Sequence, residues 1–234
     1  MPLPTKKSAV AERFEDEITL IYGAPKIGKS TFCAGFENAL FLDSETGLKN
    51  LSTYHVGIDC WETFMDTFKE LKAQVKGGKC PFRPLVFDTI DNIYQYCMDY
   101  VCKKNGLKHP SDLEFGKGWC MVRQEFNVAM AAYKALGLGV VYVSHADGTE
   151  IKTRAGNYTR YDVSMPGQAN KIIVPSCDLI LFAHSVVDEK GVEQRVLETK
   201  PSQYWNAGDK TGKLPETMPL NAKEFMKAFD KAVK

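Results

Sequence analysis

The sequence predicts an α/β fold in which a mainly parallel central sheet carries helices on both faces and continues into an antiparallel C-terminal extension. Three observations lead to this prediction. Short apolar runs alternate with helix-like segments from residue 18 to residue 144, which favours parallel strands joined by crossover helices. The first run ends in a glycine-rich loop. Beyond residue 176, two apolar runs are separated by a short Asp-Glu-Lys-Gly segment, as in antiparallel neighbours.

The first two strands are expected at residues 18–22 and 39–42. The first, Ile-Thr-Leu-Ile-Tyr, is β-branched or apolar and leads through the glycine-rich loop into a helix at 29–36. The second, Ala-Leu-Phe-Leu, has the composition of a buried strand and enters an Asp-Ser-Glu sequence.

The other elements of this region follow from similar patterns. Six apolar side chains at helical spacing predict a crossover helix over 61–75, which a Gly-Gly pair ends. Pro-Leu-Val-Phe-Asp and Gly-Val-Val-Tyr-Val-Ser predict buried strands at 84–88 and 139–144. Two helices between these strands are expected at residues 93–104 and 119–136.

The C-terminal part is polar and turn-rich over 146–176, and two strands are then expected at 178–183 and 192–199. Asn221 is placed to cap a last helix that carries Phe225, Met226 and Phe229. We therefore expect an N-terminal tail at 1–17, a main domain at 18–220 and a C-terminal helix at 221–234.

Composition narrows the class of protein. The chain has 234 residues, 44% of them hydrophobic, and a net charge of only +1, so a nucleic acid or an anionic membrane would have to meet a local patch. Its seven cysteines form no C-x-x-C pair, which argues against a zinc site and a closed disulfide framework. With neither a signal-like start nor an apolar run of about 20 residues, we expect a cytoplasmic protein without a membrane partner.

Residues 23–30, Gly-Ala-Pro-Lys-Ile-Gly-Lys-Ser, match G-x-x-x-x-G-K-[ST] between a predicted strand and a predicted helix. In this context the motif predicts a loop (P-loop) that binds the phosphates of a nucleoside triphosphate through backbone amides and the helix N-terminus. Lys29 is expected to reach the β- and γ-phosphates, and the Ser30 hydroxyl to ligate Mg²⁺. The expected contact residues are Gly23, Ala24, Pro25, Lys26, Ile27, Gly28, Lys29, Ser30 and Thr31.

Asp88 is the second predicted metal residue. It ends an apolar strand, and a carboxylate in this position can hold Mg²⁺ through water. The alternative is that Asp88 caps the following helix. Asp91 is a weaker metal candidate.

Hydrolysis needs a group that orients or deprotonates the attacking water, and a carboxylate on a strand next to that of the P-loop can do this. Asp43 and Glu45 follow the strand at 39–42, which we expect in that position. Because side chains alternate along a strand, both should project to one face, with Glu45 reaching further. We assign catalysis to Glu45. The alternative is a pair of solvated acids.

The Ala-Leu-Phe-Leu-Asp-Ser-Glu segment, the P-loop and the strand ending in Asp88 together resemble the RecA-like recombination ATPases. The order of motifs over residues 15–215 is similar to that of the compact bacteriophage members. This resemblance implies ATP and Mg²⁺ as cofactors, hydrolysis of ATP to ADP and phosphate, and a role in DNA recombination or single-strand annealing within a bacterial host cell. It further implies a homo-oligomer, either a ring or a filament, with single-stranded DNA and a single-strand-binding protein as partners.

The resemblance also suggests roles for three other residues. His145 follows Ser144 at a strand end where RecA-like ATPases have a polar sensor, although RecA itself has glutamine there. A structural histidine is the alternative. Lys200, and after it Lys210 in an expected hairpin at 201–215, fall in the region that often supplies a basic finger to the neighbouring ATP site. Ordinary surface lysines are the alternative.

Residues 151–161 contain three cations, two tyrosines and no acid. RecA-like proteins have a DNA-binding loop after the fourth strand, and this composition suits single-stranded DNA because cations follow phosphates and rings stack on bases. A basic loop without a binding role is the alternative. The candidates are Lys152, Arg154, Tyr158, Arg160 and Tyr161.

The sequence thus leads us to expect an ATPase that is stimulated by assembly or DNA and that binds single-stranded DNA according to its nucleotide state. A helicase-like motor subunit and a nucleotide switch with a protein partner are the alternative functions. Strand displacement would indicate the motor, and ATP binding with negligible turnover would indicate the switch.

Overall fold

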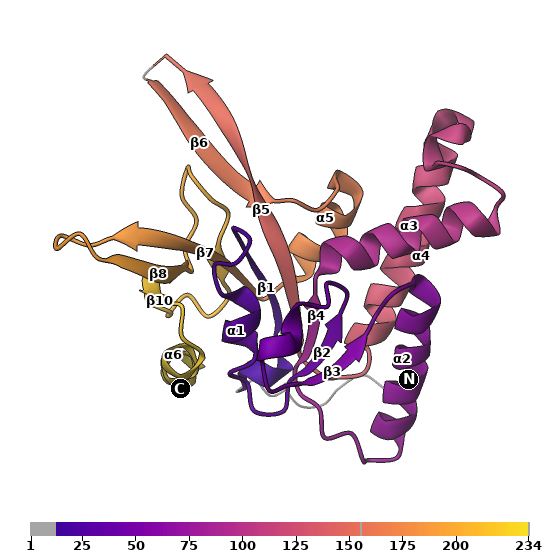
Figure 1. The fold of residues 1–234 in the computed structure, drawn as a ribbon, viewed down its shortest axis with the longest axis horizontal. Coiled ribbons are helices and arrows are strands. Elements are labelled where there is room, and N and C mark those ends of the chain that lie inside the picture. The colour runs from indigo at the N-terminus through magenta and orange to yellow at the C-terminus, as the bar shows by residue number, and fades with distance from the viewer. Residues whose placement is uncertain (1–12, 155, 234) are drawn as a thin grey trace, which may run out of the picture.

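The computed structural model describes residues 13–154 and 156–233, so residues 1–12 of the expected tail lie outside it. One sheet runs through the molecule in the strand order β10-β8-β7-β1-β5-β4-β2-β3, with β6 paired to β5 and β9 to β7 (Figure 1). The strands are β1 (Ile18–Gly23), β2 (Leu40–Asp43), β3 (Tyr54–Gly57), β4 (Leu85–Asp88), β5 (Val140–Thr153), β6 (Gly156–Val163), β7 (Leu179–Val187), β8 (Glu193–Glu198), β9 (Gly208–Asp209) and β10 (Thr217–Pro219).

The sheet has the predicted mixture of pairings. Across the sheet, in the order β3-β2-β4-β5-β1-β7, each strand is parallel to its neighbour. Strand β1 thus lies between β5 and β7. Strands β8, β9 and β10 add antiparallel pairs at the C-terminal side. The α/β prediction, with a parallel centre and an antiparallel extension, is therefore confirmed.

Helices cover both faces. The helices α2, α3, α4 and α5 lie on one face, and α1 and α6 on the other. Their bounds are α1 (Lys29–Cys33), α2 (Trp61–Lys76), α3 (Ile90–Lys104), α4 (Lys117–Lys134), α5 (Gly167–Ile173) and α6 (Ala222–Val233). Short 3-10 turns occur at η1 (Phe14–Asp16), η2 (Gly47–Asn50), η3 (Pro110–Asp112), η4 (Glu114–Gly116) and η5 (Val174–Ser176).

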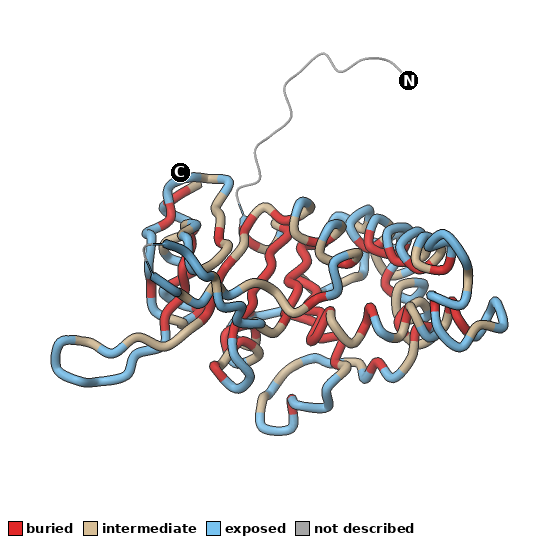
Figure 2. Tube along the Cα trace, turned by 90° about the horizontal axis from the view of Figure 1, so that it is seen from above, coloured by how far each residue is buried: buried red, intermediate tan, exposed pale blue. Residues whose placement is uncertain are grey.

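The core forms two layers because side chains alternate along each strand. Leu20, Leu42 and Phe87 face α2 to α5, whereas Ile21 and Phe41 face α1 and α6. Strands buried on both faces read as continuous apolar runs, which is why β1, β2 and β4 could be recognised. Figure 2 shows buried residues along the central strands and exposed residues along the projecting segments.

Two elements differ from the prediction near the P-loop. The first helix ends at Cys33 instead of residue 36, and the chain continues through turns in which the Gly35 and Phe36 amides donate three residues back. A Cβ atom on Gly35 would lie 2.4 Å from that of Ala222, so this turn and α6 pack too closely for a side chain there. Strand β3 was not predicted, because as an edge strand it buries none of its residues fully.

The segment after Ser144 also differs. Strand β5 continues to Thr153 and turns back as β6, forming a two-stranded hairpin that projects from the sheet (Figure 1). The polar and turn-rich composition of this region hid the hairpin, because strands with no buried face have no apolar alternation. The hairpin expected at 201–215 is absent from the described residues, where that segment contributes only β9.

The last helix confirms the sequence pattern. Asn221 Oδ1 accepts hydrogen bonds from the amides of Lys223 and Glu224, at 3.0 and 3.2 Å, so Asn221 caps α6 as expected. Phe225 and Phe229 are fully buried against the main core. Among the helices of the described residues, none is long and apolar enough to cross a membrane.

Candidate nucleotide site and the hairpin beside it

The P-loop connects β1 to α1 in the middle of the sheet. Its first residue, Gly23, pairs with His145 of β5 on one side and with Ala183 of β7 on the other. A Cβ atom at Gly23 would lie 2.2 Å from the Ala183 carbonyl oxygen, so only glycine fits. Gly28 has φ +114°, in the region that favours glycine. Both glycines of the motif thus have a structural reason.

The ammonium group of Lys29 lies at the mouth of this loop. It donates to the carbonyl oxygens of Gly23 and Ala24, both at 2.9 Å. Burial lowers the pKa of Lys29, while the nearby carboxylates of Asp88 and Glu45 oppose that shift. A phosphate group would offer this cation a charged acceptor in place of two neutral carbonyls.

Ser30 and Asp88, the two residues predicted to hold the metal, are hydrogen-bonded to each other. The Ser30 hydroxyl, in the first turn of α1, donates to Asp88 Oδ2 at 2.6 Å. Burial, with a smaller contribution from the carboxylates of Glu45 and Asp43, raises the pKa of Asp88 to about 6, although the Ser30 hydrogen bond and Lys29 oppose the shift. A divalent cation would favour the charged form of Asp88, and Mg²⁺ is usually held by one or two carboxylates together with phosphates and water. No group of three or more His, Cys, Asp or Glu residues in the described chain could hold a metal, so Mg²⁺ here would also require phosphate oxygens.

Glu45 follows the predicted strand β2, but this strand lies at an unexpected position in the sheet. Strand β2 pairs with β3 and β4, so β4 and β5 separate it from β1, and the expected neighbouring position is wrong. Two strands that come later in the chain are inserted there, which the order of motifs did not reveal. Glu45 Oε1 nevertheless lies 3.0 Å from His145 Nε2 and accepts a hydrogen bond from Thr89 Oγ1 at 3.3 Å. Glu45, His145, Lys29 and Asp88 line one cleft of about 340 Å³.

Asp43 holds the turn that carries Glu45, and the two side chains do not project side by side from one strand. Strand β2 ends at Asp43, so the alternating arrangement expected for the two acids is wrong. Buried Asp43 accepts hydrogen bonds from the backbone amides of Glu45 and Thr46, at 3.0 and 2.9 Å. These bonds fix the turn that presents Glu45 to the cleft.

A cluster of polar side chains, which the sequence did not indicate, joins the nucleotide site to the hairpin. Asp91 Oδ1 accepts hydrogen bonds from the hydroxyls of Ser144 (3.1 Å) and Ser164. The Ser164 amide also donates to the backbone oxygen of His145, at 3.0 Å. Asp91 Oδ2 and His145 Nδ1 are buried without a hydrogen-bond partner in the described chain. Asp91 therefore contacts the base of the hairpin and does not line the cleft.

The five DNA-binding candidates lie on the hairpin formed by β5 and β6, and the expected loop is therefore wrong. Lys152 and Arg160 are close to carboxylates of Glu150 (3.8 Å) and Asp162 (3.0 Å). Arg154 is exposed and has no carboxylate within 4.0 Å in the described chain. The acids lie just outside 151–161, so over the whole hairpin the charges cancel. The basic residues are Lys152, Arg154 and Arg160, and the acidic residues are Asp147, Glu150 and Asp162.

Aromatic rings from a distant segment extend the hairpin surface. The Tyr161 amide donates to the Tyr204 carbonyl at 2.7 Å, and this places the segment from 202 to 206 against β6. Tyr161 and Trp205 each stack near-parallel with Phe182, with ring centroids 5.7 and 5.6 Å apart. Tyr158 meets Tyr204 edge-on at 5.5 Å. We call Tyr158, Tyr161, Tyr204 and Trp205 the aromatic face. Only its two hairpin members were found from the sequence.

The candidate finger lysines are paired within the chain. Lys200 Nζ lies 3.4 Å from Asp209, and Lys210 forms an ion pair with Asp178. Because β8 runs antiparallel to β7, Lys200 follows the strand toward the amino-terminal edge of the parallel strands. Both lysines therefore lie toward the edge of the sheet opposite to the P-loop, which follows the carboxyl end of β1.

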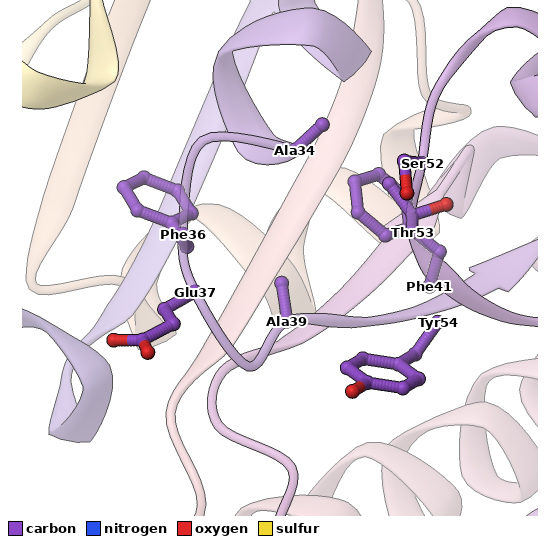
Figure 3. A pocket seen from close by; sticks show the side chains of 8 residues that line it. All are labelled: Ala34, Phe36, Glu37, Ala39, Phe41, Ser52, Thr53 and Tyr54. Carbon is purple, nitrogen blue, oxygen red and sulfur yellow. The ribbon is translucent and has the colours of Figure 1, made fainter.

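One other cleft, of about 350 Å³, lies away from this chemistry. Its lining comes from the segment after α1, from β2 and from the start of β3 (Figure 3). Glu37 is its only carboxylate, and the lining contains no basic side chain. This composition offers no arrangement for catalysis.

Comparison with known proteins gives a family match over most of the chain. The model of a family described as "AAA domain" matches residues 16–211. The chain is also similar to the SPbeta prophage-derived uncharacterized protein YorG of Bacillus subtilis (strain 168), with 25% identity over 141 residues. The matched region covers 59% of this chain but only 44% of that relative, so the chain matches less than half of the relative's length.

Proposed function

The chain belongs to the AAA domain family, a family of P-loop ATPases, and from this premise we propose that it hydrolyses ATP to control its hold on single-stranded DNA. The work proposed is DNA recombination or single-strand annealing, with Mg²⁺ as the metal ion. A prophage-derived relative supports a phage origin.

In the proposed reaction, five residues of the cleft have roles. Lys29 binds the β- and γ-phosphates, while Ser30 and Asp88 hold Mg²⁺, which supplies charge neutralisation when bound. Glu45 orients the attacking water and accepts its proton as the bond from the γ-phosphorus to the bridging oxygen breaks. His145 holds Glu45 through the 3.0 Å contact between Nε2 and Oε1. The products are ADP and phosphate.

The observation that carries the proposal is the continuity of β5. This strand contains His145, which touches Glu45, and runs without interruption to Thr153 in the hairpin. A change at the γ-phosphate side of the cleft therefore has a direct structural route to the hairpin.

The aromatic face supports a single-stranded nucleic acid as the partner. Tyr161 and Tyr204 are each 41% exposed although their rings are held by neighbours, which suits stacking on unpaired bases. Because the charges of the hairpin cancel, stacking should contribute more than phosphate contacts. Binding should consequently depend on salt less steeply than in a strongly basic protein.

The test is the ATPase rate of the purified protein with and without an oligonucleotide of single-stranded DNA, together with DNA binding at low salt. We expect faster hydrolysis with DNA, and tighter DNA binding with Mg²⁺ and ATP than without nucleotide. Absence of DNA binding under both conditions would refute the DNA function. Displacement of a duplex strand would instead favour a motor, and negligible turnover with a bound protein would favour a switch.

The proposal includes a homo-oligomer in which Lys200 acts on the neighbouring ATP site. Lys200 would have to exchange Asp209 for a phosphate, since the two are 3.4 Å apart. Mixing inactive Lys29→Ala subunits with Lys200→Ala subunits tests this idea. Activity should return in the mixture, because the intact ATP site of a Lys200→Ala subunit can then lie next to the intact Lys200 of a Lys29→Ala subunit. A mixture as inactive as its components would refute the trans role.

A further inference from the structure

A second cleft borders the P-loop on the side of β8 and α6. It has a volume of about 330 Å³, within the range that holds small ligands. Gly28 and Thr31 line both this cleft and the catalytic one, so the two meet along the loop. The rest of the lining comes from Ile27 of the P-loop, from α1 and the turn after it, from Arg195 of β8 and from residues 220–223.

The two clefts differ in charge. The catalytic cleft contains the carboxylates of Glu45 and Asp88, whereas no acid lines the second cleft, which instead contains Arg195 and Lys223. Arg195 forms no ion pair within the described chain. Its guanidinium group lies beside the P-loop, because a Cβ atom built on Gly28 would be 3.5 Å from Nη1.

The position of Arg195 is fixed by backbone bonds. It pairs with Ser185 of β7, and its carbonyl oxygen accepts a hydrogen bond from the Leu220 amide at 2.9 Å. The cap by Asn221 then starts α6 beside Leu220. Strand β8 and the segment before α6 therefore present Arg195 and Leu220 to Gly28 of the P-loop.

The polarity of the P-loop indicates which part of a ligand occupies the second cleft. The metal residues Ser30 and Asp88 and the carboxylate of Glu45 mark the end where the γ-phosphate is cleaved. A triphosphate that runs from there along the loop amides reaches Gly28 and Thr31 last. Its nucleoside must then lie on the side of Arg195.

We propose that the second cleft binds the purine nucleoside of the nucleotide, with the Arg195 guanidinium stacked on the base and Leu220 supplying apolar contact. This inference rests on the proposed nucleotide function and names the residues that hold the other half of the same ligand. A planar guanidinium suits this position, because arginine stacks on aromatic rings better than lysine does.

The experiment compares two ligands that differ in the nucleoside. Dissociation constants for ATP and for inorganic tripolyphosphate, both with Mg²⁺, are measured by calorimetry for the wild type, Arg195→Ala and Arg123→Ala. Arg123 is a matched control, because it is an exposed arginine on α4. Arg195→Ala should weaken ATP binding about tenfold, as expected for loss of a stacked cation, and leave tripolyphosphate binding unchanged. Arg123→Ala should change neither.

The outcomes separate this inference from the proposed function. Unchanged ATP affinity in Arg195→Ala, while the wild type binds ATP, would overturn the nucleoside cleft alone. An equal loss of tripolyphosphate affinity would also overturn it, because Arg195 would then act on the phosphates. A wild-type protein that binds no ATP would overturn both proposals. Arg195 is exposed, and thermal denaturation of the variant checks that it is folded.

Discussion

At the scale of single residues, the nucleotide site depends on side chains that other side chains hold in place. Glu45 is set by the turn that Asp43 caps and by its contact with His145. The P-loop, Asp88 and Glu45 could be predicted from the sequence as candidates because each has a residue type and spacing that the chemistry requires, and the structure brings them to one cleft. Asp91 and Arg195 could not be assigned, since their partners are distant in the chain and only the folded sheet brings them together.

Glu45→Gln tests the catalytic assignment. The substitution keeps the size of the side chain but removes the proton acceptor, so we expect kcat to fall by roughly 10²–10⁴-fold with ATP affinity little changed. Steady-state hydrolysis and equilibrium ATP binding measure the two effects. Glu37→Gln, at an exposed glutamate of the remote cleft, is the control and should remain active. A fully active Glu45→Gln variant would contradict the role given to Glu45.

Glu17 provides a prediction about pH. Burial and a hydrogen bond with Asp178 raise the pKa of Glu17 from its ordinary value of 4.5 to about 7; Asp16 adds to the shift, and Lys210 opposes it. Between these values the folded chain holds a proton that the unfolded chain has lost. The contribution of Glu17 to stability is therefore complete below about pH 4.5 and disappears as the pH rises through about 7.

Glu17→Gln should remove this decline, since the amide does not titrate. Urea midpoints of both proteins at pH 5 and pH 8 make the comparison. The difference between the two pH values should be smaller for the variant than for the wild type. Equal differences would show that the proton on Glu17 has no part in the pH dependence.

At the scale of elements, burial decided which parts of the fold could be predicted. Strands β1, β2 and β4 and helices α2, α3 and α4 have apolar patterns because they pack against the core. Strand β3 and the β5–β6 hairpin have little buried surface, so no pattern revealed them. The segment at 201–215 was misread because its contacts are with β6 and β7, far away in sequence.

Tyr204 belongs to the aromatic face but lies outside the hairpin, so its substitution tests this surface separately. Tyr204→Ala should weaken binding of single-stranded DNA by about 1–3 kcal/mol, because one stacking ring is lost. Fluorescence anisotropy with a labelled oligonucleotide measures the change. Tyr54→Ala removes a tyrosine that is 58% exposed on the edge strand β3, and the variant should bind DNA like the wild type. Equal affinities for all three proteins would exclude the aromatic face as the DNA site.

The packing of α6 leads us to expect a large loss of stability when Phe225 is truncated. Phe225 is fully buried, with ring centroids 5.0 Å from Phe14 and 5.4 Å from Phe32. Phe225→Ala should lower the free energy of unfolding by about 3–5 kcal/mol. Phe115→Ala is the matched control, since Phe115 is 93% exposed, and it should change stability by less than about 0.5 kcal/mol. Denaturant titration distinguishes them, and similar losses in both would contradict the packing described for α6.

At the scale of the whole molecule, the P-loop follows β1, which lies between β5 and β7 in the interior of the sheet. Ligand binding at this position should stabilise the entire fold. At 100 times its dissociation constant, Mg²⁺ with ATP should add about 2.7 kcal/mol to the free energy of unfolding. Thermal denaturation with and without the nucleotide measures this effect, which Lys29→Ala should reduce. An equal rise in the melting temperature of Lys29→Ala would place the nucleotide elsewhere.

Strand β5, which joins the nucleotide site to the hairpin, also limits how a change at one of them can affect the other. Residues 140–145 of β5 are held in register with β1, residues 140–143 also with β4, and residues 146–153 with β6. Sliding this strand by one residue would reverse its pleat, turning His145 away from Glu45 and exchanging its buried side chains between the two core layers. Strand β5 therefore cannot slide along its neighbours. A change at the nucleotide site can reach the hairpin only if the β5–β6 hairpin tilts or twists as a whole. Under the proposed function, a change at the nucleotide site would therefore reach bound DNA as a movement of the whole hairpin.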